Sequence, residues 1–313
     1  MEVALLKLTV NGYITTLTRR VMNYYFSVTD FVPSTQVRGA ILAEYYKQKG
    51  KVDMDFFVSP AFPLESAPAH YFSPASGRKS GNFVEKRGIL KEKEDELSKG
   101  RPLSEVLRLN KDDKPRVGAI IRRVEVDKDS TKYTKYTAES AISMNVAIDK
   151  TLASARHGML FAYEYRRFGE LWALARPSEV LDVVKGGEIR IGRGKNRGNT
   201  AVKVQVVREV ELPEPEGLVY CLSQCVPSLL GKEFFKVKRD SEGVPIIVGE
   251  TSTYAGWFTT DSVSGQKPSF RTLSEGTLIY IEEKRNYADL LPAGLNFALS
   301  INDLSSLLDR VRP

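Results

Sequence analysis

Cysteine and histidine are scarce in this sequence of 313 residues. It contains two cysteines, Cys221 and Cys225, and two histidines, His70 and His157. Two cysteines cannot build a disulfide framework, and their spacing differs from the two-residue gap of a zinc knuckle or a redox pair. The histidines show no H-x-x-x-H or other metal-ligand spacing. We therefore expect buried thiols, no metal site and no cofactor.

Long apolar runs are also missing. No segment reaches the roughly 20 apolar residues that a membrane-spanning helix needs. The opening MEVALLKLTV is too short for a signal peptide and lacks both a basic start and a small-residue cleavage site. No basic amphipathic helix stands out. These absences predict a cytoplasmic protein without a membrane partner.

Positive charge, by contrast, is in excess. Lys and Arg total 46 against 39 Asp and Glu, which gives a net charge of +7 and a pI near 9.2. Hydrophobic residues make up 42% of the chain, enough to bury a core and, at this length, to form two domains. The excess charge favours a polyanionic partner, with nucleic acid as the first choice.

The apolar pattern predicts an α+β protein. A strand is expected within residues 4–10, and a helix from Ser34, its cap, to about Lys47, with an apolar stripe of Val37, Ile41 and Tyr45. Residues 157–177 are typical of a hairpin that turns at 167–169 and places Met159, Phe161, Tyr163 and Tyr165 on one face. A short helix from Pro177 and a strand at 200–210 follow. This is the ferredoxin-like (RRM-like) βαββαβ order with a large insertion after the first helix.

Composition divides the chain near residue 210. Residues 1–210 are predicted to form the ferredoxin-like domain, with its insertion at about 52–140. Residues 211–218, ELPEPEGL, are typical of a linker. Residues 211–313 are predicted to form a smaller β-rich domain, which one interpretation makes a degenerate ferredoxin-like unit, ending in a short helix capped at Asn302 or Asp303. Residues 85–116 mix both signs of charge with few large apolar groups, which predicts a solvated insertion.

The most informative stretch is IGRGKNRGNTAVKVQVV, residues 191–207. Glycines at 192, 194 and 198 allow positive φ angles, and cations alternate with them at 193, 195 and 197. Such a loop suits a chain of phosphates. It lacks the P-loop pattern and does not open a helix, so a nucleotide cofactor is disfavoured. The alternative is a flexible, solvated hairpin tip.

Arg38 and Gly39 are unusual residues for a first helical turn. A cation opposes the helix dipole there, and glycine costs roughly 1 kcal/mol relative to alanine. Both suit a helix amino end that faces a phosphate, because glycine lets the backbone come close. The alternative is that Arg38 points to solvent and Gly39 relieves packing against the sheet.

Three further features have both a functional and a plain interpretation. The loop SGRKSG, residues 76–81, is basic but typical of ordinary surface. STKYTKYT, residues 130–137, could stack bases between lysines, or form an exposed strand. For catalysis, Asp30 could act on a bound strand or simply order the 30–34 turn, and His157 could be a general acid or base or a surface residue.

Three motifs together resemble the RAMP superfamily, the repeat-associated proteins of CRISPR systems. They are TDFVPSTQVRGAI at 29–41, NVAIDKTLASARHGMLFAYEYRRFGELWALA at 145–175, and IGRGKNRGNTAVKVQVV at 191–207. They occur in the family's order across most of residues 1–207. The added C-terminal segment, with AGWFTTDSVSGQKPSF and SEGTLIYIEE, resembles the type III-D effector subunit that caps the 5′ tag of the guide RNA.

The resemblance implies a non-catalytic subunit that holds the 5′ tag of the crRNA. Its partners would be the guide RNA, the large polymerase-like subunit and the RAMP backbone subunits, with the insertion as a thumb-like or partner-facing element. The RNA contacts carried over are Arg38, Gly39, Gly192, Arg193, Gly194, Lys195, Asn196, Arg197 and Gly198. Two alternatives remain: a RAMP endoribonuclease or target-cutting backbone subunit that uses Asp30 or His157, and a basic β-rich scaffold that binds only proteins.

Overall fold

The computed structural model describes residues 1–313 except 17, 150, 152–153, 193–200, 260–263 and 267. Its chain contacts define two units. The N-terminal unit contains residues 2–64 and 137–210, with Pro313; the composite unit contains residues 65–136 and 211–312, with Met1. The sequence predicted that the insertion of about 52–140 is part of the first domain. In the structure, most of that insertion, residues 65–136, forms one unit with residues 211–312.

A five-stranded sheet with the order β12-β13-β1-β11-β4 forms the centre of the N-terminal unit. Ala4–Thr9 of β1 pair antiparallel with Glu170–Ala175 of β11. The successive residues Leu5 and Leu6 of β1 are both fully buried, so both faces of this strand are covered. The strands are β1 (Glu2–Val10), β4 (Phe62–Pro63), β11 (Glu170–Ala175), β12 (Glu188–Arg190) and β13 (Ala201–Glu211).

Two helices of this unit, α1 (Ser34–Lys49) and α4 (Glu179–Val184), pack against each other. The predicted stripe of α1 is confirmed, because Val37, Ile41 and Tyr45 are all fully buried. The predicted cap is wrong: Pro33 is the N-cap, and Ser34 is the first helical residue. The Ser34 hydroxyl instead donates to the carbonyl of Val58 at 2.6 Å, so it is used for a tertiary contact rather than for the helix end.

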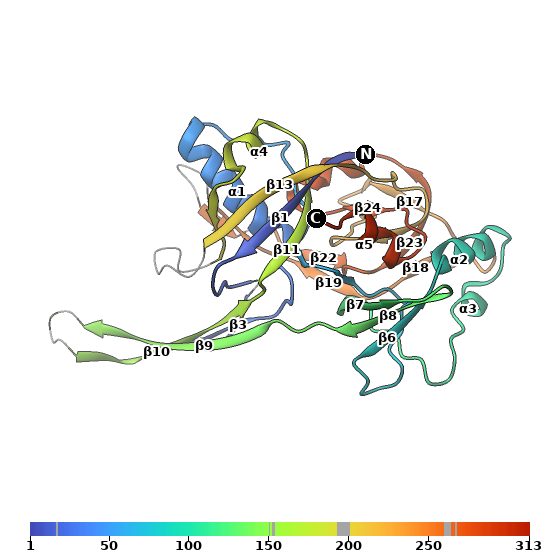
Figure 1. Ribbon diagram of the computed structural model, residues 1–313, viewed down its shortest axis with the longest axis horizontal. Coiled ribbons are helices and arrows are strands. Elements are labelled where there is room, and N and C mark those ends of the chain that lie inside the picture. The colour runs from blue at the N-terminus through green and yellow to red at the C-terminus, as the bar shows by residue number, and fades with distance from the viewer. Residues whose placement is uncertain (17, 150, 152–153, 193–200, 260–263, 267) are drawn as a thin grey trace. The chain divides into compact units, whose positions relative to one another are not determined.

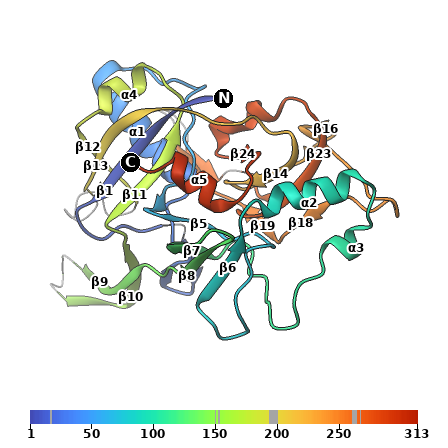
Figure 2. The ribbon, with the colours of Figure 1, turned by 45° about the vertical axis from the view of Figure 1, so that its right-hand side comes forward.

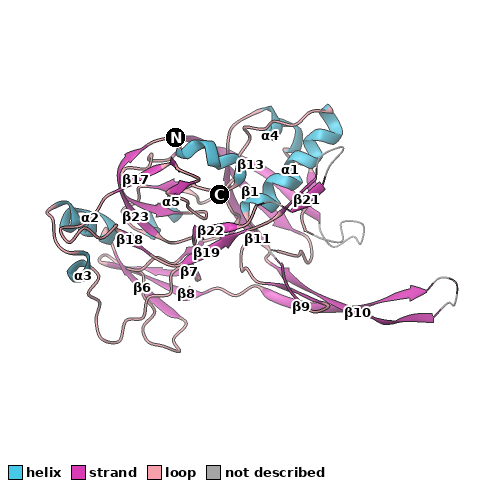
Figure 3. Ribbon diagram, turned by 180° about the vertical axis from the view of Figure 1, so that it is seen from behind, coloured by secondary structure: helices cyan, strands magenta, loops and turns pink. Residues whose placement is uncertain are grey.

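A second sheet of the N-terminal unit has the order β2-β3-β10-β9. Its strands are β2 (Thr18–Val21), β3 (Tyr24–Ser27), β9 (Glu139–Asp149) and β10 (Ser154–Arg167). β9 and β10 run as a long pair that extends away from β1 and β11 (Figures 1 and 3). The predicted hairpin of 157–177 is therefore wrong. Its turn exists, with Gly169 at φ 75°, but β10 pairs with β9 and β3 while β11 pairs with β1 and β4.

Among the described residues, the composite unit contains one four-stranded sheet, one five-stranded sheet and several short pairs. The first has the order β5-β7-β8-β6, which we call the insertion sheet; the other has the order β17-β23-β14-β24, with β18 also beside β23. The insertion sheet is formed by β5 (Ser66–Pro68), β6 (Asn82–Lys86), β7 (Ile120–Val126) and β8 (Ser130–Lys135). The second consists of β14 (Gly217–Cys221), β17 (Phe235–Val237), β18 (Ile247–Val248), β23 (Leu278–Lys284) and β24 (Ala298–Leu299).

Short elements complete the composite unit (Figure 2). The second sheet buries a cluster that includes Cys221 and Cys225, both thiols being free and fully buried, as predicted. The remaining elements are α2 (Ile89–Ser98), α3 (Leu103–Val106), β15 (Ser228–Leu229), β16 (Lys232–Glu233), β19 (Thr251–Tyr254), β20 (Trp257–Thr259), β21 (Ser264–Gln266), β22 (Phe270–Leu273), η2 (Tyr287–Ala293) and α5 (Leu304–Arg310).

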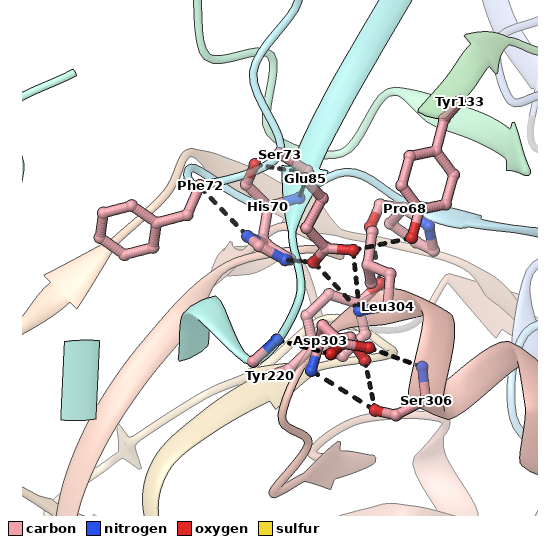
Figure 4. Close-up of polar contacts among 11 residues, drawn as sticks. Pro68, His70, Phe72, Ser73, Glu85, Tyr133, Tyr220, Asp303, Leu304 and Ser306 are labelled. Carbon is pink, nitrogen blue, oxygen red and sulfur yellow. Dashed lines mark hydrogen bonds and ion pairs between the residues drawn. The ribbon is translucent and has the colours of Figure 1, made fainter. Parts of the chain in front are cut away.

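Glu85 joins the insertion to the C-terminal helix inside the composite unit (Figure 4). Its carboxylate is 1% exposed and accepts three donors: His70 Nε2 at 2.6 Å, the Tyr133 hydroxyl at 2.7 Å and the Leu304 amide at 3.0 and 3.1 Å. A buried carboxylate is tolerated only with such partners. The predicted solvation of 85–116 holds for most of this stretch, which is exposed or half-buried, but not for Glu85 and the α2 residues Leu90 and Leu97, which are buried.

The C-terminal helix α5 begins as predicted. Asp303 is its N-cap and accepts from the Ser306 amide at 2.7 Å, while the Ser306 side chain bonds back to Asp303. This reciprocal capping box satisfies amides that the first turn cannot pair. None of the helices in the described ranges is both long and apolar enough to cross a membrane.

Candidate nucleic-acid interface

Arg38 lies on α1 and its guanidinium is used within the chain. Nε donates to the carbonyl of Phe56 at 2.7 Å, and Nη2 donates to the carbonyl of Met54 at 2.9 Å. Asp53 orders the same segment by accepting from the amides of Asp55 and Phe56 at 3.0 and 3.1 Å. Arg38 therefore fixes the segment after α1, so the interpretation that it merely points to solvent is wrong. Its predicted RNA contact stays a prediction.

Gly39 is exposed on the helix surface. A Cβ built at this position would meet no heavy atom within 4 Å. The interpretation that Gly39 relieves packing against the sheet is therefore wrong. The helix keeps an unfavourable residue at a position where nothing in the described part of the chain requires it, and its backbone stays open to a partner from outside.

Gly192 begins the predicted phosphate loop and is under strong steric constraint. Its φ is +87°, and an added Cβ would lie 2.6–2.9 Å from Thr15 Oγ1, O and N. Only glycine satisfies both the left-handed backbone and this close approach. Gly192 thus anchors the start of the loop against Thr15. The rest of the predicted site, Arg193, Gly194, Lys195, Asn196, Arg197 and Gly198, lies outside the described residues.

The two predicted halves of the site contact different segments. α1 is held through Ser34 and Arg38 to residues 54–58, whereas Gly192 lies against Thr15. β12, which leads into the loop, contacts α1. The Lys47 hydrogen bond lowers the pKa of Glu44 in the second half of this helix, and the charge of Arg190 on β12 adds a smaller effect in the same direction. The RNA-binding role of both segments, and their common ligand, stay predictions.

One face of the β9–β10 sheet is aromatic. Tyr25 stacks on Tyr163 at 4.8 Å between ring centroids, and Tyr163 meets Phe161 at 5.7 Å and Tyr165 at 6.4 Å, both edge to face. The predicted common face of Phe161, Tyr163 and Tyr165 is confirmed, while the side chain of Met159 lies outside the described set. A shallow cavity of about 270 Å³ opens here, lined by Asn23, Tyr25, Leu160, Phe161 and Tyr163.

The other face of the same sheet is aliphatic and exposed. Met144 pairs with Ala162, which pairs with Tyr24, so all three share this face. The stripe along β9 consists of Ile142, Met144, Val146 and Ile148, which are 45–65% exposed. The sequence patterns described above did not predict this exposed aliphatic stripe. The pattern that could have predicted it is the alternation of aliphatic residues in ESAISMNVAID, a segment without the Lys or Pro that protects many edge strands.

The Asp30 carboxylate is held by two neighbouring groups. Its Oδ1 accepts from the Ala138 amide at 3.1 Å and lies 3.5 Å from the Arg166 guanidinium. Arg166 also lies 3.2 Å from Glu164. These contacts connect Asp30 to residue 138 and β10, which differs from the predicted ordering of the 30–34 turn. The side chain of His157 lies outside the described residues.

The Lys–Tyr alternation of residues 130–137 is divided between two environments. Tyr133 is 2% exposed and its hydroxyl donates to Glu85, and burial, helped by the charge of Glu85, raises its pKa. Lys132 lies between Glu125 at 2.8 Å and Asp127 at 3.3 Å. The prediction that bases stack on both Tyr133 and Tyr136 is therefore wrong. Side chains of a strand alternate between its two faces, and that of Tyr133 lies on the buried face. Within the described ranges, no three His, Cys, Asp or Glu side chains form a metal-binding group.

Comparison with known proteins gives a match in fold and none in sequence. No family model and no curated protein matches the chain. A chain of the cryo-EM structure of the Type III-B Cmr-beta bound to cognate target RNA and AMPPnP, state 1, superposes with a TM-score of 0.50 at 13% identity, covering 98% of this chain and 93% of that one. A chain of the Cmr-beta structure bound to cognate target RNA has a TM-score of 0.48 at the same identity and coverage. The first match shows a shared fold.

Proposed function

We propose that this chain is a non-catalytic, guide-RNA-binding subunit of a type III CRISPR effector complex. The observation that carries the proposal is the shared fold, over 98% of the chain, with a chain of the Type III-B Cmr-beta structure. The three RAMP-like motifs and the net charge of +7 support it independently. The finer assignment, a type III-D subunit that holds the 5′ tag of the crRNA, rests on the resemblance of the C-terminal segment.

The N-terminal unit is, in this proposal, a ferredoxin-like domain. Its support is the strand order β13-β1-β11-β4, with α1 between β1 and β4 along the chain and α4 between β11 and β13. In that arrangement each helix connects two strands that flank a third, which is the split βαβ pattern. β12 adds an edge strand, antiparallel to β13.

RNA contact is assigned to the loop that Gly192 anchors and to the open backbone at Gly39. Arg193, Lys195 and Arg197 supply three cations within five residues, and glycines between them permit the backbone to turn its amides toward phosphates. Gly39 supports this role because it leaves the helix backbone accessible without any packing reason. Arg38 contributes by holding residues 54–56 beside the helix.

Contact with another protein subunit is assigned to the aliphatic stripe of β9. Soluble monomers rarely expose a contiguous row of large aliphatic side chains, and an unprotected edge strand invites pairing with another chain. Replacement of Ile142 and Met144 by Glu should abolish incorporation into the complex and leave the melting temperature unchanged. Val124→Glu, at a 67% exposed valine of the composite unit, is the matched control and should assemble normally.

The absence of catalysis is likewise a proposal. Its support is that the Asp30 carboxylate is held by Ala138 and Arg166. Asp30→Ala, and separately His157→Ala, should leave target cleavage by the reconstituted complex unchanged. Loss of cleavage with RNA binding intact would instead favour the ribonuclease alternative.

The central test is a salt titration of guide-RNA binding. If Arg193, Lys195 and Arg197 each neutralise one phosphate, replacing all three by Ala should flatten the dependence of log affinity on log salt by about 2. Lys47, Lys49 and Lys185 are a matched set of three exposed cations in the same unit, and their replacement should not change the slope by that amount. An equal slope change in both variants would remove the loop from the site.

The 5′ tag is tested with two guides that differ only in that tag. The complex assembled on the tagged guide should contain this chain, and the complex assembled on the tagless guide should lose it. Equal incorporation would refute tag capping and leave general guide binding in place. A coding region beside a CRISPR array and a large polymerase-like subunit would support the class without any biochemistry.

A further inference from the structure

One end of the insertion sheet gathers six cations. The first residues of β6 and β7 and the last residues of β8 lie at this end, because Asn82 pairs with Thr134 and Thr134 pairs with Arg122. Ala75 bridges both Phe83 and Lys114, which adds the segments of residues 75 and 114 at the same end. We call this surface the basic end; its members are Arg78, Lys79, Lys114, Arg116, Arg122 and Lys135.

The loop that carries Arg78 and Lys79 is held in place from within the composite unit. Ser76 N donates to Asn82 O at 3.0 Å and closes the loop. The Arg116 guanidinium donates to the carbonyls of Gly77, at 3.3 Å, and Arg78. Lys135 N donates to Gly81 O at 2.7 Å, so the last residue of β8 lies directly beside the loop. Arg78, Lys79 and Lys135 are all exposed.

The cations of the basic end have no carboxylate partner among the described residues. No ion pair within 4 Å involves any of the six, whereas Lys132, at the opposite end of β8, lies between Glu125 and Asp127. Lys86, at the far end of β6, pairs with Glu92 at 2.5 Å. Positive charge is thus balanced at one end of the sheet and unbalanced at the other.

Arg122 lies at the same end of the sheet but on the face opposite to that of Lys135, because Arg122 pairs with Thr134 and Lys135 pairs with Ile121. Its guanidinium carbon lies 4.6 Å from the ring centroid of Tyr136, a cation–π contact. Its Nε is buried and has no hydrogen-bond partner among the described residues. An unsatisfied buried donor costs free energy unless a ligand or water completes it. Because this Nε is buried, Arg122 contributes its positive charge to the basic end rather than this donor.

We infer that the basic end binds the phosphate backbone of a nucleic-acid strand, without base specificity, as a second contact surface separate from the loop at 192–198. The inference rests on the proposed function, because the strand would be the RNA that the complex carries. Five neighbouring chain segments at about 4.8 Å spacing span roughly 19 Å, which is wide enough for several consecutive phosphates. The loop SGRKSG, which alone is typical of plain surface, gains its role from this placement.

The test is a salt titration of the full-length chain with an oligouridine strand longer than about 16 nucleotides. Replacing Arg78, Lys79 and Lys135 by Ala should reduce the slope of log affinity against log salt by about 2. The control replaces Lys91, Lys99 and Lys232, three exposed lysines of the same unit, by Ala. Both triple variants should retain the wild-type melting temperature, because all six side chains lie on the surface.

The outcomes separate this inference from the proposed function. If the wild type binds and the Arg78, Lys79 and Lys135 variant matches the control, the basic end is not a nucleic-acid site and the loop can still be one. If the slope of log affinity against log salt falls in this variant but not in the Arg193, Lys195 and Arg197 variant, the basic end is a nucleic-acid site and the loop assignment fails. Absence of any salt-dependent binding by the wild type overturns both.

Discussion

The Glu85 carboxylate accepts the backbone amide of Leu304, at 3.0 and 3.1 Å, across 219 positions of sequence. It therefore caps the start of α5 from a strand of the insertion. The same carboxylate accepts from His70 Nε2, while His70 Nδ1 accepts from the Phe72 amide at 3.1 Å. This arrangement fits a neutral imidazole that donates through Nε2.

Replacing Glu85 by Ala should destabilise the composite unit by about 3–5 kcal/mol, because it leaves the buried donors of His70, Tyr133 and Leu304 unpaired. Hydrogen exchange at the Leu304 amide should accelerate. Glu92→Ala removes an exposed ion pair with Lys86 and should cost less than about 1 kcal/mol. An equal loss in the free energy of unfolding for the two substitutions would show that the contacts of Glu85 do not stabilise the composite unit.

Replacing Gly192 by Ala should destabilise the N-terminal unit by more than the roughly 1–2 kcal/mol of a left-handed backbone alone. The added Cβ would lie within 3 Å of the Thr15 backbone. Gly169 has a similar φ of +75° with no atom within 4 Å of an added Cβ, so Gly169→Ala isolates the backbone cost. Thermal unfolding gives the melting temperatures of both variants, and equal melting temperatures would contradict the prediction.

Replacing Gly39 by Ala should stabilise α1 by about 1 kcal/mol and at the same time weaken guide-RNA binding. The stability gain follows from helix propensity, since the new Cβ meets nothing in the described chain. Ala43 is exposed on the same helix, and Ala43→Gly should cost a similar amount without affecting RNA. Unchanged RNA affinity in Gly39→Ala would remove this position from the interface.

Glu275 should make the composite unit less stable as pH rises. Burial raises the pKa of this carboxyl from 4.5 to about 7. Between these values the folded chain retains a proton that the unfolded chain has released, so the free energy of unfolding falls with rising pH and levels off above about 7. Glu275→Gln should flatten the melting temperature over this range, and Glu250→Gln, at an exposed residue, should leave the slope unchanged.

The local features of the fold were accessible from the sequence. The buried stripe of α1 follows from its helical period, the capping of α5 by Asp303 from the preference for acceptors at a helix start, and the burial of both thiols from their spacing. Apolar periodicity, which is a property of neighbouring residues, also predicted β1, α1 and β13, but it predicted neither β2 and β3 nor the partners of β10. For the candidate site, the sequence predicted the positive φ of Gly192, whereas the close approach of Thr15 that excludes any side chain came from the tertiary structure.

The sequence by itself determined the segments of strong apolar periodicity, such as β1, α1 and β13, and the excess of positive charge. Tertiary structure alone decided their partners: β10 pairs with β9 rather than β11, the charged insertion packs with the C-terminal segment, and Glu85 meets Leu304. These outcomes depend on contacts between residues far apart in the chain, whose free energy comes from burial and from satisfying buried polar groups. No local pattern encodes them, which is why the insertion looked solvated while its central carboxylate lies in the core.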